Sequence, residues 1–335
     1  MAQELTVVVT GSTGKQGGAV ARGLLERGHK VRAVTRDPNS SQAKLLANAG
    51  ATLVAASLAD TAAVMKALEG ATSLFAMTTP FGGTALETRQ GVVAADAAKT
   101  AGVHLVFTSV GNADRQTGIP HFDSKYEVEK HIAKIGVRAT ILAPVSFMEN
   151  LYFVKEQLAK GIYAAALPPT RALAQVAVAD IGAVAVRALE DAGRFTGKRF
   201  DLASDELTGN DAVAILSRVT GRPFLPITRS RSMSSESAWA RMPPGCTNGS
   251  TASVLRWIAP RSTVNFPTSP STTSSLGRRR RTGMRFCTAH RGRPRGMASS
   301  ILRRYAPAGR RQASFRRLSW ITRIRKLCYR ADVKG

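Results

Sequence analysis

Short apolar runs alternate with longer amphipathic segments along the first 142 residues of the chain. Six runs rich in Val, Leu, Ile and Ala predict strands that are buried on both faces, at residues 5–10, 30–35, 51–55, 73–77, 103–109 and 138–142. The intervening segments predict helices at residues 14–27, 42–48, 60–68, 88–100 and 123–134. Strands that alternate with helices predict βαβ units, and therefore an α/β fold with a doubly wound parallel sheet.

The pattern is weaker after Pro144. Residues 180–191 and 208–220 predict helices, and residues 199–203 predict a strand. We expect a core domain over residues 1–150, and a small, truncated subdomain on the substrate side over residues 151–224. The remaining residues, 225–335, form a tail of different composition.

A glycine-rich loop follows the first predicted strand directly and opens the first predicted helix. Glycines at these positions let the backbone turn tightly, approach a pyrophosphate and pack the helix against the strand. The helix N-terminus adds free N–H groups and a partial positive charge. The loop therefore predicts a Rossmann-type dinucleotide site. Its residues are Gly11, Ser12, Thr13, Gly14, Lys15, Gln16 and Gly17.

The second predicted strand ends at Thr35, which is followed by Arg36 and Asp37. A carboxylate at this point prefers the ribose 2′-hydroxyl of NAD, whereas Arg prefers the 2′-phosphate of NADP. Because Arg36 comes first after the strand, we expect NADP as the cofactor. Asp37 leaves NAD as an alternative.

Several segments together resemble the NmrA-like family, a branch of the atypical short-chain dehydrogenases in which the glycines have the G-x-x-G-x-x-G spacing found here. These segments are GSTGKQGG at 11–18, TRDP at 35–38, FAMTTPF at 75–81, ETRQG at 87–91, HFDSKYEVEKHI at 121–132 and SFMENL at 146–151. The resemblance spans residues 5–224 and implies a Rossmann domain that binds NAD(P).

The resemblance also implies cofactor contacts beyond the glycine loop. They are Thr78 and Thr79 after the fourth strand, Lys125 on the nicotinamide side, and Phe147, Glu149 and Asn150 in a segment that closes over the nicotinamide. Ser57 and Leu58, which follow the third predicted strand, are two further predicted contacts.

Two overlapping registers bear on catalysis. Classical short-chain dehydrogenases use Ser, Tyr and Lys, with Tyr as the proton donor and Lys lowering its pKa. His121 with Lys125 is similar to the family's degenerate version, in which His replaces Tyr, whereas Tyr126 with Lys130 matches the literal Tyr-x-x-x-Lys pattern. We favour the first register, because Tyr126 lies one position after Lys125, rotated by ~100° around the helix. Tyr126 would then face away from the nicotinamide.

Ser109 ends the fifth predicted strand, where a catalytic Ser would lie. It is a candidate for a hydrogen bond to a substrate carbonyl. The alternative is an ordinary serine at a strand end.

The charge of the chain is concentrated in its last third. Residues 1–224 hold 24 Lys and Arg against 20 Asp and Glu, a net charge of +4, whereas residues 225–335 hold 24 against 2, a net charge of +22. Arg dominates this tail and no amphipathic period continues through it. A nucleic-acid-binding arm and a disordered tail are two interpretations.

A shifted reading frame is the third interpretation of the tail, and the one we favour. Codons rebuilt from the last base of one codon and the first two of the next permit acidic, amphipathic segments over residues 227–253 and 262–276. These segments are similar to the usual C-terminal end of NmrA-like proteins. We therefore expect a frameshifted, disordered tail, no specific nucleic-acid partner, and an incomplete substrate pocket.

Other features exclude several classes of protein. Cys246, Cys287 and Cys328 fit no metal-binding spacing and are odd in number, so we expect neither a metal site nor a disulfide framework. The N-terminus has no leader pattern, and no apolar run approaches the ~18 residues of a membrane span. We therefore expect a cytoplasmic protein without a membrane partner.

Two functions follow from the resemblance. The first is an NADP(H)-binding sensor or regulator that acts through a protein partner, and the second is an NADPH-dependent reductase of a quinone or another small carbonyl compound. His121 at the position of the catalytic Tyr favours the first.

Overall fold

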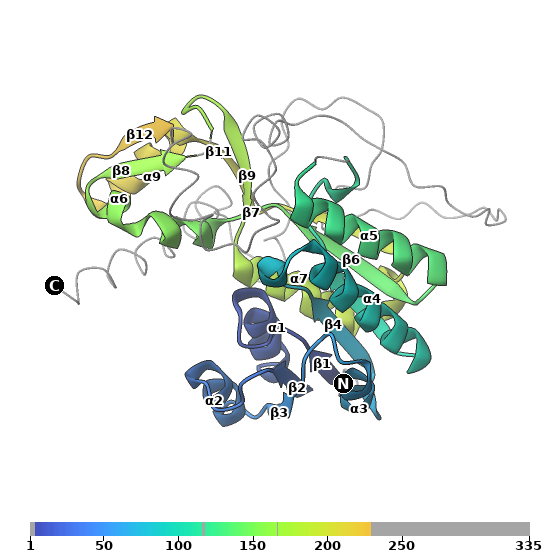
Figure 1. Ribbon diagram of the computed structural model, residues 1–335. Coiled ribbons are helices and arrows are strands. Elements are labelled where there is room, and N and C mark those ends of the chain that lie inside the picture. The colour runs from blue at the N-terminus through green and yellow to red at the C-terminus, as the bar shows by residue number, and fades with distance from the viewer. Residues whose placement is uncertain (1–3, 116–117, 166, 229–335) are drawn as a thin grey trace, which may run out of the picture.

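A seven-stranded parallel sheet forms the centre of the molecule (Figure 1). The computed structural model describes residues 4–115, 118–165 and 167–228. The strand order across the sheet is β10-β6-β5-β4-β1-β2-β3, and every neighbouring pair is parallel. In chain order these strands are β1 (Thr6–Val9), β2 (Lys30–Thr35), β3 (Thr52–Ala55), β4 (Ser73–Met77), β5 (His104–Thr108), β6 (Ala139–Pro144) and β10 (Lys198–Leu202).

Helices cover both faces of this sheet. One layer holds α1 (Lys15–Leu25), α2 (Ser41–Asn48) and α7 (Val178–Glu190), and the other holds α3 (Thr61–Leu68), α4 (Thr84–Thr100) and α5 (Pro120–Ile135). The short helix α8 (Ala192–Phe195) follows α7. Val7 and Val9 pack into the first layer and Val8 into the second, each no more than 1% exposed. Burial on both faces explains why β1 is apolar at successive positions.

A smaller part with its own core lies to one side of the main sheet (Figure 1). Its strands form a three-stranded sheet, β11-β9-β7, and a two-stranded sheet, β12-β8. Met148, Leu151, Leu216 and Phe224 are among its buried residues. The elements are β7 (Ser146–Phe147), the 3₁₀ helix η3 (Met148–Val154), α6 (Lys155–Ala159), β8 (Ile162–Ala165), β9 (Ala172–Val176), β11 (Asp205–Thr208), α9 (Gly209–Thr220) and β12 (Leu225–Thr228).

The structure confirms the α/β class and the parallel sheet, and it contains every predicted strand and helix. Two helices begin three or more residues earlier than predicted, α4 at Thr84 rather than residue 88 and α5 at Pro120 rather than residue 123. Pro120 occupies the first helical turn, where its missing N–H costs nothing and its fixed φ suits a helix.

The boundaries of the small subdomain also differ from the prediction. We expected all of residues 151–224 in it, yet β10 pairs with β6 in the main sheet and α7 packs on α1. The small subdomain also continues past residue 224, because β12 pairs with β8 and the Leu225 amide donates to the Gly161 carbonyl at 2.8 Å. The frameshift and disorder predicted for residues 225–335 otherwise concern residues 229–335, which lie outside the described residues.

Candidate dinucleotide site

The predicted site residues gather at the carboxyl ends of the central parallel strands. The strand order reverses between β1 and β4, because the chain proceeds from β1 through β2 to β3 on one side and from β4 to β5 and β6 on the other. Ligands of doubly wound sheets bind outside the carboxyl ends of the strands at this switch point. The loop after β1 and the segment after β4 border it here.

The loop after β1 has the geometry that its glycines predict. Gly11 has a φ of 59°, and a Cβ there would overlap the side chain of Met77. A Cβ at Gly17 would overlap the carbonyl oxygens of Gly11 and Thr10, so only glycine lets α1 lie this close to β1. No side chain caps the N-terminus of α1 at Gly14. The amides at this end of α1 are therefore directed to the space in which a phosphate would bind.

Two side chains of the loop hold it in place. The buried Ser12 hydroxyl donates to the Val34 carbonyl of β2 at 2.8 Å, so this side chain faces the sheet. The Gln16 side-chain carbonyl accepts from the Thr108 hydroxyl at the end of β5 at 2.8 Å. Thr13 is half-buried between them. The loop therefore presents its backbone, rather than the Ser12 hydroxyl, to a ligand.

Lys15 connects the loop to the segment that follows β7. Its ammonium donates to the Glu149 carbonyl at 3.4 Å and lies 5.8 Å from the centre of the Tyr152 ring and 5.0 Å from that of Phe153. Burial lowers the pKa of Lys15, and the charge of Glu149 opposes that change. The Glu149 carboxylate accepts from the Val178 amide at 3.1 Å and so caps α7.

Phe147 and Asn150 flank Glu149 in the same segment. Phe147 lies in β7 beside Val176 of β9 and packs against the main core. Asn150 is exposed. This segment therefore contacts the glycine loop, the three-stranded sheet and the core of the main sheet.

Arg36 and Asp37 follow β2 and differ in how they are bound. Within the described residues, no hydrogen bond or ion pair involves the exposed Arg36 side chain. The Asp37 carboxylate accepts from the Asn39 amide at 2.9 Å and so forms part of the turn. Arg36 is therefore the side chain available to a ligand at this edge.

Ser57 and Leu58 lie in the loop after β3, next to β2. The Ala56 amide donates to the Thr35 carbonyl at 3.1 Å, which holds the two strand ends together. The Ser57 hydroxyl accepts from the Ala59 amide at 3.3 Å, and Leu58 is half-buried.

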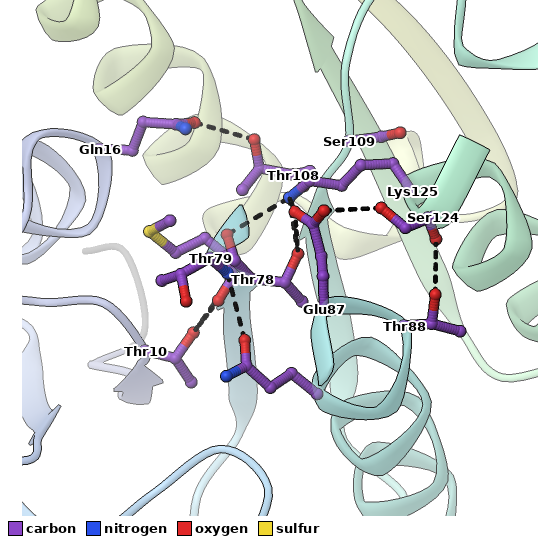
Figure 2. A network of polar contacts seen from close by, with 12 residues as sticks. Thr10, Gln16, Thr78, Thr79, Glu87, Thr88, Thr108, Ser109, Ser124 and Lys125 are labelled. Atoms are coloured by element: carbon purple, nitrogen blue, oxygen red, sulfur yellow. Dashed lines mark hydrogen bonds and ion pairs between the residues drawn. The ribbon is translucent and has the colours of Figure 1, made fainter. Parts of the chain in front are cut away.

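Lys125 lies at the centre of a buried polar network at the ends of β4 and β5 (Figure 2). Its ammonium donates to the Thr78 hydroxyl at 2.7 Å and to the carbonyls of Thr78 and Thr108 at 3.4 and 3.3 Å. It also forms an ion pair with Glu87 of α4 at 3.4 Å. Burial lowers the pKa of Lys125, whereas the charge of Glu87 and the hydrogen bond to it raise the pKa.

Thr79 follows Thr78 and is tied to α4. Its amide donates to the Gln90 side chain at 3.1 Å. Both threonines thus lie at the end of β4 as the sequence predicts. Glu87 and Gln90 were not among the predicted site residues, although both fall within the segment 87–91 that carried part of the resemblance.

The two candidate catalytic registers occupy different sides of α5. His121 is half-buried and interacts electrostatically with both Glu87 and Lys125; burial lowers its pKa, Glu87 raises it and Lys125 lowers it. Tyr126 instead lies under the ammonium of Lys130, 5.4 Å from its ring centre, and Lys130 is exposed and paired with Glu127 at 2.6 Å. Only the register of His121 and Lys125 therefore places its lysine at the strand ends.

Ser109 is engaged in a second buried network. Its hydroxyl donates to the Glu129 carboxylate, which also accepts from Arg199 of β10 at 2.9 Å. In Figure 2 the Ser109 hydroxyl points away from Thr78, Thr79 and Gln16. This geometry fits the ordinary strand-end serine better than a serine that binds a substrate carbonyl.

The comparisons with known proteins agree with the geometry of this site. The sequence profile of the NmrA-like family matches residues 3–230. The chain belongs to the NmrA-like family. Quinone oxidoreductase 2 of Escherichia coli (strain K12) is 30% identical over 221 residues, which cover 64% of this chain and 75% of that protein. The NmrA-like oxidoreductase FrzB of Cladobotryum sp is 34% identical over 169 residues, 46% of this chain, and the chain spans 49% of its length.

Solved structures show the same fold. The E. coli NADPH-dependent quinone oxidoreductase, solved with NADPH, has a TM-score of 0.61 and 27% identity, with 74% of this chain and 90% of that chain covered. NmrA, a negative transcriptional regulator solved with NADP, has a TM-score of 0.61 and 24% identity, with 67% and 74% covered.

Among residues 4–228 as described, no three His, Cys, Asp or Glu side chains are grouped to hold a metal ion. No helix in the described ranges is long and apolar enough to cross a membrane. A hollow of about 330 Å³ lies at the opposite, amino ends of β1 and β2, where Arg27 and Glu190 are already paired at 3.0 Å.

Proposed function

We propose that this chain binds NADP(H) at the carboxyl ends of its central strands and acts as a redox-sensing regulatory protein. The observation that carries this proposal is the pairing of a close-packed glycine loop with the buried Lys125, without a tyrosine in the register of that lysine. His121 takes that place, and the Ser109 hydroxyl is bound to Glu129. The groups proposed for the cofactor side of a dehydrogenase site are therefore available, whereas His121 stands in place of the usual proton donor.

Each part of the cofactor has a matching group in this site. The amides of the glycine loop would hold the pyrophosphate, and Arg36 would hold the 2′-phosphate. Lys125 would bind the nicotinamide-side ribose, with Thr78 and Thr79 beside it. When bound, the reduced cofactor NAD(P)H would supply a hydride, and the oxidised cofactor NAD(P)⁺ would accept one. NAD stays an alternative ligand because Asp37 neighbours Arg36.

An NADPH-dependent reductase of a quinone or another small carbonyl compound is the second candidate function. The similarity to quinone oxidoreductase 2 favours it. In a sensor, by contrast, the output is a contact with a protein partner. We place the protein in the cytoplasm and propose no membrane or specific nucleic-acid partner.

Calorimetry on the full chain tests the cofactor. We expect NADPH to bind more tightly than NADH, because a charge-assisted hydrogen bond contributes about 1.5–3 kcal/mol. Arg36→Ala should remove most of this preference. Lys44→Ala is the matched control, because it removes an exposed cation from the neighbouring helix α2 and should leave the preference intact. Equal affinity of the unmodified chain for both cofactors would overturn the role of Arg36.

Hydride consumption tests which function applies. The chain is incubated with NADPH and a panel of quinones and aldehydes, and the absorbance of NADPH is followed. A sensor binds NADPH without sustained turnover of any of these compounds. Turnover of a quinone at a rate typical of enzymes, in the range of ~1–10³ s⁻¹, would establish the reductase instead.

A further inference from the structure

Glu87 is a buried carboxylate with no part in the proposed contacts to the cofactor. It lies in the first turns of α4 and is 1% exposed. The Thr78 hydroxyl donates to one of its oxygens at 3.2 Å, and the Ser124 hydroxyl donates to the other at 2.6 Å. The Lys125 ammonium also contacts Glu87, at 3.4 Å (Figure 2). Glu87 is therefore held by Thr78, which follows β4, and by Ser124 and Lys125 of α5.

The ammonium of Lys125 is enclosed by oxygens and by one aromatic face. Besides Glu87 it contacts the hydroxyl and carbonyl of Thr78 and the carbonyl of Thr108. The Phe107 ring centre lies 5.6 Å away. Threonine hydroxyls and carbonyls solvate a cation but carry no net charge. Glu87 is therefore the group that neutralises this buried ammonium directly.

We propose that Glu87 is the positioning residue that keeps Lys125 protonated and holds it at the ends of β4 and β5, ready for the nicotinamide-side ribose. The proposal rests on the proposed cofactor site. Glu87 does not touch the cofactor itself. It acts through Lys125, and the Thr78 and Ser124 hydroxyls fix its carboxylate in the required orientation.

Other charged groups near Lys125 act more weakly. Glu129, on the same helix α5, adds a smaller charge effect and is itself paired with Arg199 at 2.9 Å. His121 also lies on α5, and its protonated form would disfavour the charged form of Lys125, because two positive charges repel each other. Within the described residues, the ends of β4 and β5 face Lys125 with threonine oxygens and the Phe107 ring. The uncharged Gln16 of α1 contacts the Thr108 hydroxyl rather than the ammonium.

Removal of the Glu87 charge should change the protonation of Lys125. An isolated ammonium in a buried site loses its proton readily, because burial disfavours the charged form. Glu87→Gln keeps the size of the side chain and one carbonyl acceptor but removes the charge. The pKa of Lys125 should then be lower than in the unmodified chain, because burial is no longer opposed by the charge of Glu87.

The first experiment measures the protonation of Lys125 without any cofactor. The full chain is labelled at lysine ¹³Cε, the Lys125 signal is assigned by its loss in Lys125→Met, and the signal is followed by NMR against pH. In Glu87→Gln the titration should move to lower pH, and Glu87→Asp should partly restore it. Glu129→Gln is the matched control, because it removes an equally buried carboxylate next to a different cation, and it should move the titration less. Superimposable titrations in Glu87→Gln and the unmodified chain would overturn the proposal.

The second experiment measures the affinity for the cofactor. Calorimetry with NADPH between about pH 7 and about pH 9 should show the affinity of Glu87→Gln falling more steeply with pH than that of the unmodified chain, because a larger share of Lys125 has lost its proton at each pH. Parallel affinity profiles would contradict the proposal. If the unmodified chain does not bind NADPH at all, the proposed cofactor site fails, while the NMR titration still decides the role of Glu87.

A double variant keeps the proposal testable if Glu87→Gln alone does not fold. Lys125→Met removes the cation that Glu87 neutralises. The combined variant Glu87→Gln/Lys125→Met should then regain the folded state by circular dichroism, or be more stable in urea where Glu87→Gln still folds, because no buried charge is left alone. A double variant no more stable than Glu87→Gln would show that Glu87 has a purely structural role.

Discussion

His104 makes the stability of this fold depend on pH in a way that can be worked out from its surroundings. It lies in β5 and is 1% exposed, with one ring nitrogen 3.0 Å from the Thr140 hydroxyl of β6. Its other ring nitrogen, Nδ1, has no hydrogen-bond partner among the described residues. Burial, and secondarily the charge of Arg138, lowers the pKa of His104 from 6.5 to about 4.

The direction of the effect follows from the pH at which the native and the unfolded state each bind the proton. Between the ordinary pKa of 6.5 and the native value of about 4, the unfolded chain carries the proton and the native chain does not. The stability that the neutral His104 contributes is therefore fully present above the pKa of the unfolded state. It is lost as the pH is lowered toward the pKa of the native state. At about pH 5 the free energy of unfolding should be about 2 kcal/mol lower than at about pH 7.5, because one pKa unit corresponds to about 1.36 kcal/mol.

Urea unfolding at a series of pH values measures this loss. Circular dichroism is the suitable signal, because Trp239, Trp257 and Trp320 all lie outside the described residues. His104→Leu should be less stable at neutral pH, but its free energy of unfolding should change by about 2 kcal/mol less between about pH 7.5 and about pH 5. The dependence of the unfolding free energy on pH is compared between His104→Leu and the unmodified chain, because other groups also titrate in this range and contribute equally to both.

Thr140→Val is the control for the lost hydrogen bond. It removes the hydroxyl partner but leaves the imidazole buried, so the steep dependence on pH should remain. If His104→Leu and the unmodified chain give parallel curves of stability against pH, the imidazole is not held neutral in the fold and the reasoning fails.

Two further substitutions test the site directly. Gly17→Ala should destabilise the chain by about 1–3 kcal/mol in urea unfolding, because its Cβ would overlap backbone carbonyls. Gly23→Ala in the same helix meets only a Val186 methyl at 3.2 Å and should be close to neutral; equal losses in both variants would argue against the close contact of α1 with β1. Lys125→Ala should weaken NADPH binding in calorimetry by at least tenfold, about 1.4 kcal/mol, and Tyr126→Phe should not. Turnover of a carbonyl substrate that is lost in Tyr126→Phe with unchanged NADPH affinity would instead identify a conventional reductase.

The central sheet could be predicted because its strands are buried on both faces. A strand such as Val7 to Val9 must be apolar at every position, and this signal is local in the sequence. The short strands of the smaller part lack it. β8 and β9 contain several alanines and are only partly buried, so neither a strict alternation nor a continuous apolar run distinguishes them from a loop.

The site was predicted as far as it depends on contiguous residues. The glycine loop and the lysine of α5 are each recognisable from their own segment. Glu87 is different, because a glutamate in the first turns of a helix is usually a solvated residue that favours the helix dipole. Only the fold brings it to Lys125, and no local pattern indicates that it is 1% exposed. The hydrogen bond from Ser109 to Glu129 depends in the same way on Arg199, which comes much later in the chain.

Helix α5 carries two buried charges of opposite kind, and the choice of cation at each place fits its task. Glu129 is held by Arg199, which also donates to Asp201 at 2.6 Å and to the Val110 carbonyl at 3.2 Å. Burial works against the charge of Arg199, but the carboxylates of Glu129 and Asp201 raise its pKa, so the guanidinium keeps its charge and its contacts fix β10 to α5. Burial raises the pKa of Glu129, whereas the charge of Arg199 lowers it. A guanidinium is suited to such a permanent, branched contact. One turn earlier, burial lowers the pKa of the Lys125 ammonium, and the charge of Glu87 raises it in part. If Lys125 binds the ribose as proposed, its ammonium would exchange protein oxygens for ribose hydroxyls, whereas an arginine bound like Arg199 could not do so without breaking the sheet-to-helix contact.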